Sequence, residues 1–253
     1  MRTRPPLQDY IPKQSTRKYM FIFAHVFAGA LLGLLFWHLT SDRRALPLCI
    51  AGSVLPDVID KSLGLLFPSV LGAGRTVFHS LMIVGVVVLC ILLVFRSRSA
   101  MSGVELASAF LMHQVLDEMW DLPVNWFWPL LGPFQGQMIP DYFSTYFWFE
   151  ITNPSEWMFM IGSLVILARS YKGKMFIPKT ALPLKLKTAA CVVVVAVFLC
   201  SGLYLLAAGL TDTSATFIAP RYSQVPTVFA GLLALCGTVV MIREMVRLRH
   251  VVL

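Results

Sequence analysis

The feature that most constrains this fold is a series of long apolar runs joined by short polar connections. The first run, residues 19–39, is long enough to cross the ~30 Å hydrocarbon core of a bilayer as a helix. Hydrophobic residues make up 57% of the chain and charged residues 13%, which excludes an ordinary soluble domain. We predict an all-α protein, a polytopic transmembrane helical bundle with about six to seven membrane segments.

The chain is expected to form one integral membrane domain over residues 1–253, because no Pro/Gly/Ser-rich linker divides it. The first run lacks a small-residue cleavage site and is interpreted as a retained helix rather than a signal peptide. Within the domain we expect metal-site helices over 19–121, interfacial aromatic loops over 122–154, and scaffold helices over 155–253. The predicted helices are 19–39, 45–59, 77–95, 102–119, 155–170, 186–209 and 225–246, and the second is short or re-entrant.

Charge and cysteine content narrow the possible partners. The formal net charge of +8 is typical of cytoplasmic loops facing anionic lipid headgroups, so membrane lipids are expected partners and nucleic acid is not. The five cysteines lie within apolar stretches without CxxC spacing, which indicates small core residues rather than disulfides or thiolate metal ligands.

Ionisable residues interrupt this apolar pattern between residues 53 and 80. Asp57, Asp60, Lys61, Arg75 and His79 lie between apolar helices. A charged side chain in the hydrocarbon costs at least ~2.5–3.5 kcal/mol, so such residues are functional candidates whose partners should be sought elsewhere in the chain.

Other ionisable residues recur at helical spacing. His25, Gly29 and Gly33 share one helix face, which lets a neighbouring helix approach closely, and His113 is followed by Asp117 and Asp121 at four-residue intervals. If the first four segments cross the membrane in alternation, six of these side chains fall at one membrane face: His25, Asp57, Asp60, His79, His113 and Asp117.

The same alternation predicts an orientation. It places thirteen of the 21 Lys and Arg residues on the opposite face, namely Arg43, Arg44, Arg96, Arg98, Arg169, Lys172, Lys174, Lys179, Lys185, Lys187, Arg243, Arg247 and Arg249. The positive-inside rule then places the site on the extracytoplasmic side of the plasma (inner) membrane, although the basic N-terminus argues for the reverse.

Imidazoles and carboxylates without thiolates suit a divalent ion, with zinc held by three protein ligands and one open position as the first candidate, and the number of carboxylates allows a second ion. Such an ion activates water at neutral pH. Simpler interpretations remain open: His25 as a hydrogen-bonded core residue, Asp57 as a helix cap, and His113 with Asp117 as an isolated pair.

Four short motifs carry a family resemblance. His25 in AHVFAG, then LPDVIDK, GRTVFHS and HQVLD, resemble the family of membrane-bound metal-dependent hydrolases also described as LexA-binding and inner-membrane-associated. The resemblance covers roughly residues 20–121. It implies that His25, Asp57, Asp60, His79, His113 and Asp117 are metal ligands or their immediate partners, and that Arg75 matches the family's arginine. Gly74 and Phe78 depart from the family's HRG-x-THS pattern, and Gly74 replaces a histidine.

These observations predict a membrane-embedded metal-dependent hydrolase acting on a lipid or lipid-linked (phospho)ester. Asp60 or Asp121 is expected to act as general base or to orient a ligating histidine. Arg75 and Lys61 suit a phosphate group, and Ser80 is a further substrate-binding candidate, although both cations also suit helix ends that balance aspartates.

Two alternatives stay open. One is a ceramidase-like intramembrane amidase, for which Ser80 beside His79 is suggestive. The other is a non-catalytic scaffold or partner-binding protein with a degenerate metal site, which the glycine at position 74 favours.

Overall fold

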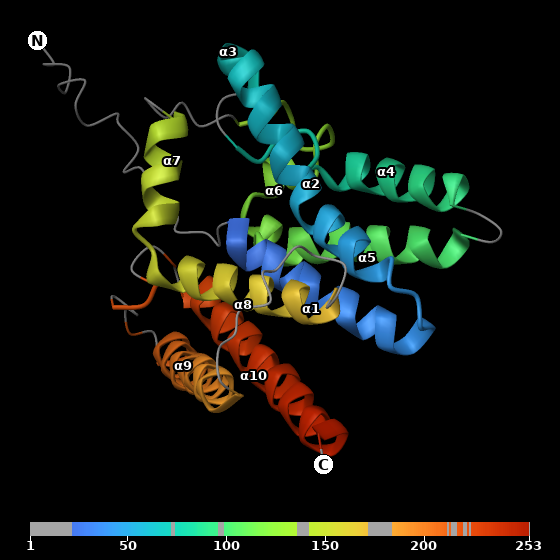
Figure 1. The fold of residues 1–253 in the computed structure, drawn as a ribbon. Helices are drawn as coiled ribbons and strands as arrows, with labels where there is room; N and C mark the ends of the chain where they lie inside the picture. Colours follow the sequence, from blue (N-terminus) through green and yellow to red (C-terminus); the bar gives the residue numbers. More distant parts are fainter. Residues whose placement is uncertain are drawn as a thin grey trace, which may run out of the picture.

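The computed structural model describes residues 22–71, 74–95, 99–135, 142–171, 184–211, 213, 217–219, 222 and 224–252. Every regular element in these residues is helical, which confirms the all-α prediction (Figure 1). The elements are α1 (Ile22–Thr40), α2 (Ala45–Leu66), α3 (Pro68–Leu71), α4 (Leu81–Val94), α5 (Ala100–Leu116), η3 (Met119–Asp121), α6 (Pro123–Trp126), α7 (Tyr142–Ile151), α8 (Pro154–Ser170), α9 (Leu184–Leu210) and α10 (Gln224–Val252).

Helix α1 is the centre of the bundle and contacts α2, α5, α8 and α10 (Figure 1). Its sequence is apolar around the whole circumference, as expected for a helix surrounded by other helices or lipid. On its α2 side, a Cβ atom at Gly29 would lie 2.7 Å from the carbonyl oxygen of Cys49. The predicted close approach at this glycine face is therefore confirmed, and only a residue without a side chain fits.

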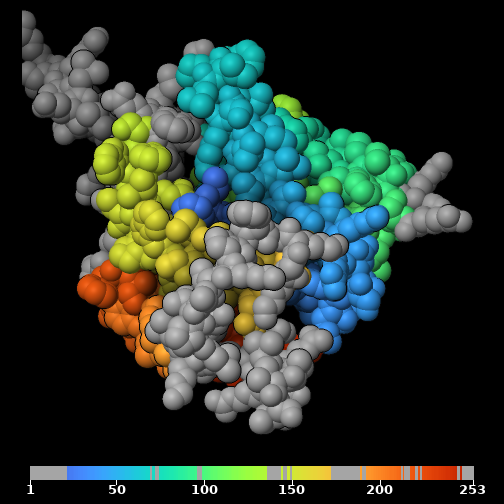
Figure 2. All heavy atoms as spheres, in the orientation of Figure 1, coloured from blue at the N-terminus to red at the C-terminus, as the bar shows by residue number. Residues whose placement is uncertain are grey.

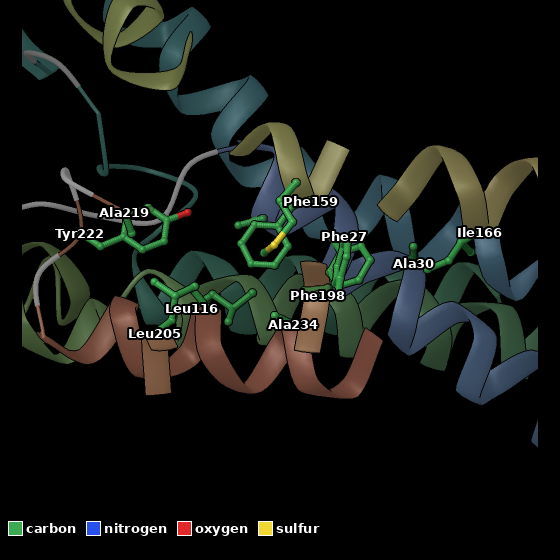
Figure 3. Close-up of a cluster of buried hydrophobic side chains, with 14 of the residues drawn as sticks. Phe27, Ala30, Leu116, Phe159, Ile166, Phe198, Leu205, Ala219, Tyr222 and Ala234 are labelled. Atoms are coloured by element: carbon green, nitrogen blue, oxygen red, sulfur yellow. The ribbon is translucent and has the colours of Figure 1, made fainter. Parts of the chain in front are cut away.

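The apolar core lies on the opposite side of α1. Phe27 contacts Phe159 of α8 and Phe198 of α9, with ring centroids 5.3 and 5.4 Å apart, and Figure 3 shows the three rings together. All three side chains are fully buried. Aromatic pairs in this range contribute ~0.5–1.5 kcal/mol beyond the area they bury, so α1 is held firmly against α8 and α9.

Helix α2 is longer than predicted. We expected it to end near residue 59, but it continues through Pro56 to Leu66. A proline inside a helix removes one backbone hydrogen bond and costs ~3 kcal/mol, which is why the sequence favours an earlier end. The extension is supported by the Asp57–Lys61 ion pair along the helix and by the anchoring of Asp60 to the following loop.

The close contact of α2 with α5 depends on a second glycine. A Cβ atom at Gly52 would lie 2.6 Å from the carbonyl oxygen of Leu106 on α5. The two helices therefore approach almost backbone to backbone one turn before Pro56. This approach brings Asp57 of α2 within 3.9 Å of His113 on α5.

Two predicted helix boundaries near the polar residues were also wrong. His79 and Ser80 do not lie in the first turn of the next helix, because residues 77–80 form a turn and α4 begins at Leu81. Helix α5 ends at Leu116, with Asp117 as its C-terminal cap rather than inside the helix. In both places the chain leaves the helix to direct polar side chains into the bundle.

Three helices in the described residues are long and apolar enough to span a membrane: Ile22–Thr40, Val192–Leu210 and Gln224–Arg243. This is fewer than the six to seven segments expected. Helix α4 has 14 residues and rises only ~21 Å, α5 and α8 have 17 residues each, and α2 carries three charged residues near its end. Apolar composition alone overstated the number of full-length spans.

The surface carries many apolar side chains, as expected for a protein surrounded by lipid. Leu89 and Val94 on α4, and Leu203 on α9, are each more than half exposed. Interfacial aromatic loops were predicted over 122–154, and the described residues of this range include the short helices α6 and α7, with Trp148 exposed on α7. Figure 2 shows α7 and the α3 end of α2 at the same end of the molecule.

Candidate metal centre

Four side chains form one buried group of potential metal ligands: Asp57 of α2, His79 of the turn before α4, and His113 and Asp117 at the end of α5. Each offers one ligand atom, and these atoms all lie within 4.8 Å of one another. The structure therefore brings together residues separated by up to 60 positions in the sequence. Among the described residues this is the one such group.

The two histidines of the group face each other through the same ring atom. Their Nε2 atoms are 3.0 Å apart. The Nδ1 atom of His113 donates to the carbonyl oxygen of Ser53 at 2.7 Å, and Nδ1 of His79 donates to a carboxylate oxygen of Asp60, also at 2.7 Å. Because a carbonyl oxygen only accepts, the hydrogen of neutral His113 is on Nδ1 and its Nε2 carries a lone pair.

Asp57 contributes one oxygen to the group and uses the other for an ion pair. Its Oδ2 accepts from Lys61 Nζ at 2.7 Å, one helical turn further along α2. Its Oδ1 lies 3.7 Å from Nε2 of His79 and 3.9 Å from Nε2 of His113. The lysine thus holds the carboxylate in place with one oxygen directed at both imidazoles.

Asp117 occupies the opposite side of the group. Its Oδ2 lies 3.3 Å from Nε2 of His79 and 3.6 Å from Nε2 of His113, and it is paired with Nε of Arg75 at 2.6 Å. The arginine also donates from Nη1 to the Asp117 carbonyl oxygen at 3.1 Å. The two predicted substrate-binding cations, Arg75 and Lys61, are therefore both placed directly beside the carboxylates of the group.

His25 lies outside the four-residue group but touches it. Its Nε2 donates to Oδ1 of Asp117 at 3.1 Å, and its ring lies over that of His113 with centroids 4.3 Å apart. In the structure His25 is therefore a hydrogen-bond partner of Asp117 rather than a member of the four-residue group.

Asp60 is fully buried and orients His79. Its carboxylate accepts from the backbone N–H groups of Thr76 and Phe78 at 2.9 Å as well as from the imidazole. A carboxylate on the far nitrogen of a metal-ligating histidine is a common arrangement, since it selects the tautomer and raises the basicity of the ligand. Of the two roles suggested for Asp60, its geometry matches that of an orienting group.

The surroundings of His79 favour positive charge. Burial by itself lowers the pKa of His79, but hydrogen bonds with Asp117 and Asp60 and the nearby charge of Asp57 outweigh it and raise the pKa to about 9. Surroundings that stabilise the protonated, positively charged form of His79 also suit a metal cation electrostatically.

The remaining predicted site residues are not members of the four-residue group. Ser80 is fully buried and its hydroxyl donates to the carbonyl oxygen of Trp128 at 3.0 Å. Asp121 is exposed in η3. Gly74, where the family pattern has histidine, has φ +111°, a conformation that side-chain-bearing residues rarely adopt. The loop of this chain is therefore built for glycine at that position.

Glu118 is a residue that sequence reasoning missed. It follows Asp117, adopts a left-handed backbone conformation with φ +50°, and is buried. Burial and the charge of Asp121 raise its pKa to about 7, although Arg75 opposes the shift. Nothing in the residue order signalled this, because a glutamate at a helix end is ordinarily solvated.

Apolar helices that bury a histidine–aspartate group define a helical membrane protein with a potential metal centre. The chain belongs to the YdjM inner membrane protein family, which matches residues 20–215. This confirms the membrane localisation, and the description of the family names neither a reaction nor a metal. In comparisons with curated proteins and with solved structures, nothing matches the chain.

Proposed function

We propose that this protein is a membrane-embedded hydrolase that uses a divalent metal ion and acts on a lipid or lipid-linked ester or phosphoester. The facing imidazoles carry the proposal. His79 and His113 both direct Nδ1 at an acceptor, which leaves both Nε2 atoms pointing at one space shared with Asp57 and Asp117. Two ring nitrogens 3.0 Å apart repel each other unless a proton or a cation lies between them.

The donor set fits such an ion. Imidazole nitrogens and carboxylate oxygens, without thiolate, are ligand types of zinc at catalytic sites; three of the four residues would hold the ion and leave a fourth position for water, and manganese is the next candidate. A bound ion of this kind would supply Lewis-acid activation of water at neutral pH. Asp60 and His25 would then hold His79 and Asp117 in their orientations.

The chain's own cations suit an anionic headgroup. Arg75 and Lys61 lie beside the group, and the lysine side chain is 32% exposed, which leaves it accessible from outside. Val58 and Leu65 on the same helix are more than half exposed, so apolar surface adjoins the charged end of Lys61. An amphiphilic substrate would place its charged group at Lys61 and its apolar part on this adjoining surface. Asp121 remains our candidate for the general base, and its exposure leaves the carboxylate accessible to water.

A second candidate function is a scaffold that keeps the polar group for stability. The observation that favours it is charge balance within the protein. Lys61 pairs with Asp57 and Arg75 pairs with Asp117, so each carboxylate of the group has a cationic partner without an ion. The ceramidase-like alternative finds less support, because the Ser80 hydroxyl is buried and donates to a backbone carbonyl.

The first experiment is metal quantification by mass spectrometry on gently purified protein. We expect about one zinc or manganese per chain and its loss in His79→Ala, whereas His38→Ala retains it because His38 is exposed and lies outside the group. Absence of metal from the wild type would contradict the hydrolase proposal.

A second experiment separates catalysis from scaffolding. If the group is catalytic, Asp57→Asn folds but fails to restore the lipid composition of cells that lack the protein. Loss of folding in Asp57→Asn, or restoration of the lipid composition by the folded variant, would indicate a scaffold. Lipidomics of the same cells identifies the substrate: accumulation of an ester or phosphoester lipid supports the proposal, and accumulation of an amide-linked lipid supports the amidase.

We also propose that the site faces the extracytoplasmic side, on the charge distribution given above. The test uses variants without native cysteines. Membrane-impermeant maleimide should label Asp121→Cys in intact spheroplasts and leave Arg43→Cys, near the start of α2, unlabelled. The reverse labelling pattern would refute this orientation.

A further inference from the structure

A buried carboxylate on α8 holds the N-terminus of α1. Glu156 is 1% exposed, and its Oε2 accepts from the backbone N–H groups of Phe23 at 2.9 Å and Ala24 at 3.2 Å. The first N–H groups of a helix have no partner within the helix, and negative charge is favourable at that end. Glu156 therefore fixes the start of α1 from a helix 133 positions away.

The other oxygen of this carboxylate is held by a third segment. Tyr222, which precedes α10, donates its hydroxyl hydrogen to Oε1 of Glu156. Beside it, the N–H of Ser155 donates to the carbonyl oxygen of Ile218 at 2.9 Å. Both oxygens of Glu156 are thus engaged by hydrogen-bond donors, which makes it a fixed joint between α1, α8 and residues 218–222 rather than a ligand for a cation.

The joint lies next to the metal centre along the chain. His25 directly follows Ala24 in the first turn of α1. Its Nε2 donates to Asp117, while its Nδ1 is buried and has no hydrogen-bond partner. No second hydrogen bond therefore orients the ring, and its direction depends on where the backbone of α1 lies.

We propose that Glu156 is a positioning residue of the metal centre. By fixing the N–H groups of Phe23 and Ala24 it sets the position of His25, which in turn holds Asp117 toward His79 and His113. This rests on the proposed metal centre. It assigns to α8 and to Tyr222, which the sequence indicated only as scaffold, a direct part in shaping the site.

A matched control is available in α5. Glu105 is also a fully buried glutamate within a helix, but neither of its carboxylate oxygens has a hydrogen-bond partner. It lies two helical turns before His113 and is not a member of the ligand group. Replacing it tests the loss of a buried charge without disturbing α1.

The experiment measures cobalt(II) affinity of the purified full-length protein, using Co²⁺ absorption as the readout. Glu156→Ala should weaken binding by up to about tenfold, less than the 10–100-fold that is typical when a direct partner of a metal ligand is lost. Glu156→Gln keeps one acceptor oxygen for the two N–H groups and should recover part of that loss. Glu105→Gln should stay within about twofold of the wild type.

A double-mutant cycle with His25→Ala shows whether Glu156 acts through the histidine. The effect of Glu156→Ala should largely disappear in the His25→Ala background. Equal effects in both backgrounds would overturn the proposal while leaving the metal centre in place. If Glu156→Ala does not fold, Glu156→Gln replaces it in the cycle.

A separate readout distinguishes failure of this proposal from failure of the proposed function. If the wild type binds no Co²⁺, the metal-dependent function is refuted, and ¹⁵N spectra of histidine-labelled protein then test the position of His25. The His25 ring resonances should shift in Glu156→Gln and not in Glu105→Gln. Unchanged resonances in both variants would overturn the positioning role.

Discussion

Asp60→Asn is the substitution that examines the metal centre most directly without removing a ligand. The buried carboxylate accepts from the N–H groups of Thr76 and Phe78 and from Nδ1 of His79. Asparagine has nearly the same shape but only one acceptor oxygen, and its amide group donates. The variant therefore favours the His79 tautomer with hydrogen on Nε2, the atom that faces His113.

The expected losses of metal affinity and of stability follow from the hydrogen bonds that the Asp60 carboxylate accepts. Loss of a group that orients a metal-bound histidine typically weakens metal affinity about 10–100-fold, which is about 1.4–2.7 kcal/mol of binding free energy. The backbone around Thr76 loses one of its charged acceptors, and a lost hydrogen bond to a charged group costs about 1.5–3 kcal/mol of stability. We therefore expect Asp60→Asn to fold with a lower melting temperature and to bind zinc more weakly.

Zinc affinity is measured by competition with a chromophoric chelator, and stability by thermal unfolding in the same detergent. Asp42→Asn is the matched control, because Asp42 also accepts a backbone N–H, that of Arg44 at 2.8 Å, but at the opposite end of α2. Its zinc affinity should equal that of the wild type. Wild-type affinity in Asp60→Asn, with affinity lost in His79→Ala, would refute the orienting role of Asp60.

Three further outcomes are expected. Gly52→Ala places a methyl group 2.6 Å from a carbonyl oxygen of α5 and should lower both melting temperature and zinc affinity, whereas Gly85→Ala, with nothing within 4 Å, should raise stability by about 0.5–1 kcal/mol in thermal unfolding. Glu118→Gly should stabilise the protein by about 1 kcal/mol in the same assay, because glycine adopts φ +50° without strain. Removing metal with a chelator should lower the melting temperature of the wild type, since a ligand at 100 times its Kd contributes about 2.7 kcal/mol, and should leave His113→Ala unchanged. These three expectations would be contradicted if Gly52→Ala were stabilised, if Glu118→Gly were destabilised, or if the chelator lowered the melting temperatures of the wild type and His113→Ala equally.

The convergence of the polar residues was predictable because helices that cross a membrane alternate in direction. The predicted segments have Asp57 near the end of 45–59, His79 at the start of 77–95 and His113 near the end of 102–119, so alternating segments place all three at one face. The structure brings these three residues together with Asp117. The short connections between segments, together with the need of buried charged residues for partners, were sufficient to predict that these side chains converge.

Element boundaries and span number were less predictable. Apolar composition does not distinguish a helix long enough to cross the bilayer from a shorter one, as α4 with 14 residues and α5 with 17 residues show. A proline and two aspartates indicated an early end for α2, yet contacts from the loop that contains Thr76 stabilise its continuation. Tertiary contacts override local preference wherever they contribute more free energy.

By itself, the sequence determined that this chain enters a membrane as helices and gathers imidazoles and carboxylates at one end of them, because burying a charge in hydrocarbon demands a partner. Only the tertiary structure decided which nitrogen of each imidazole faces the centre, and that His25 supports Asp117 while Asp60 supports His79. It also decided that Glu156 and Tyr222, from the second half of the chain, anchor the helix that carries His25. The reason is physical: a hydrogen bond depends on the position and direction of atoms within a few tenths of an ångström, and residue spacing along a helix does not specify either.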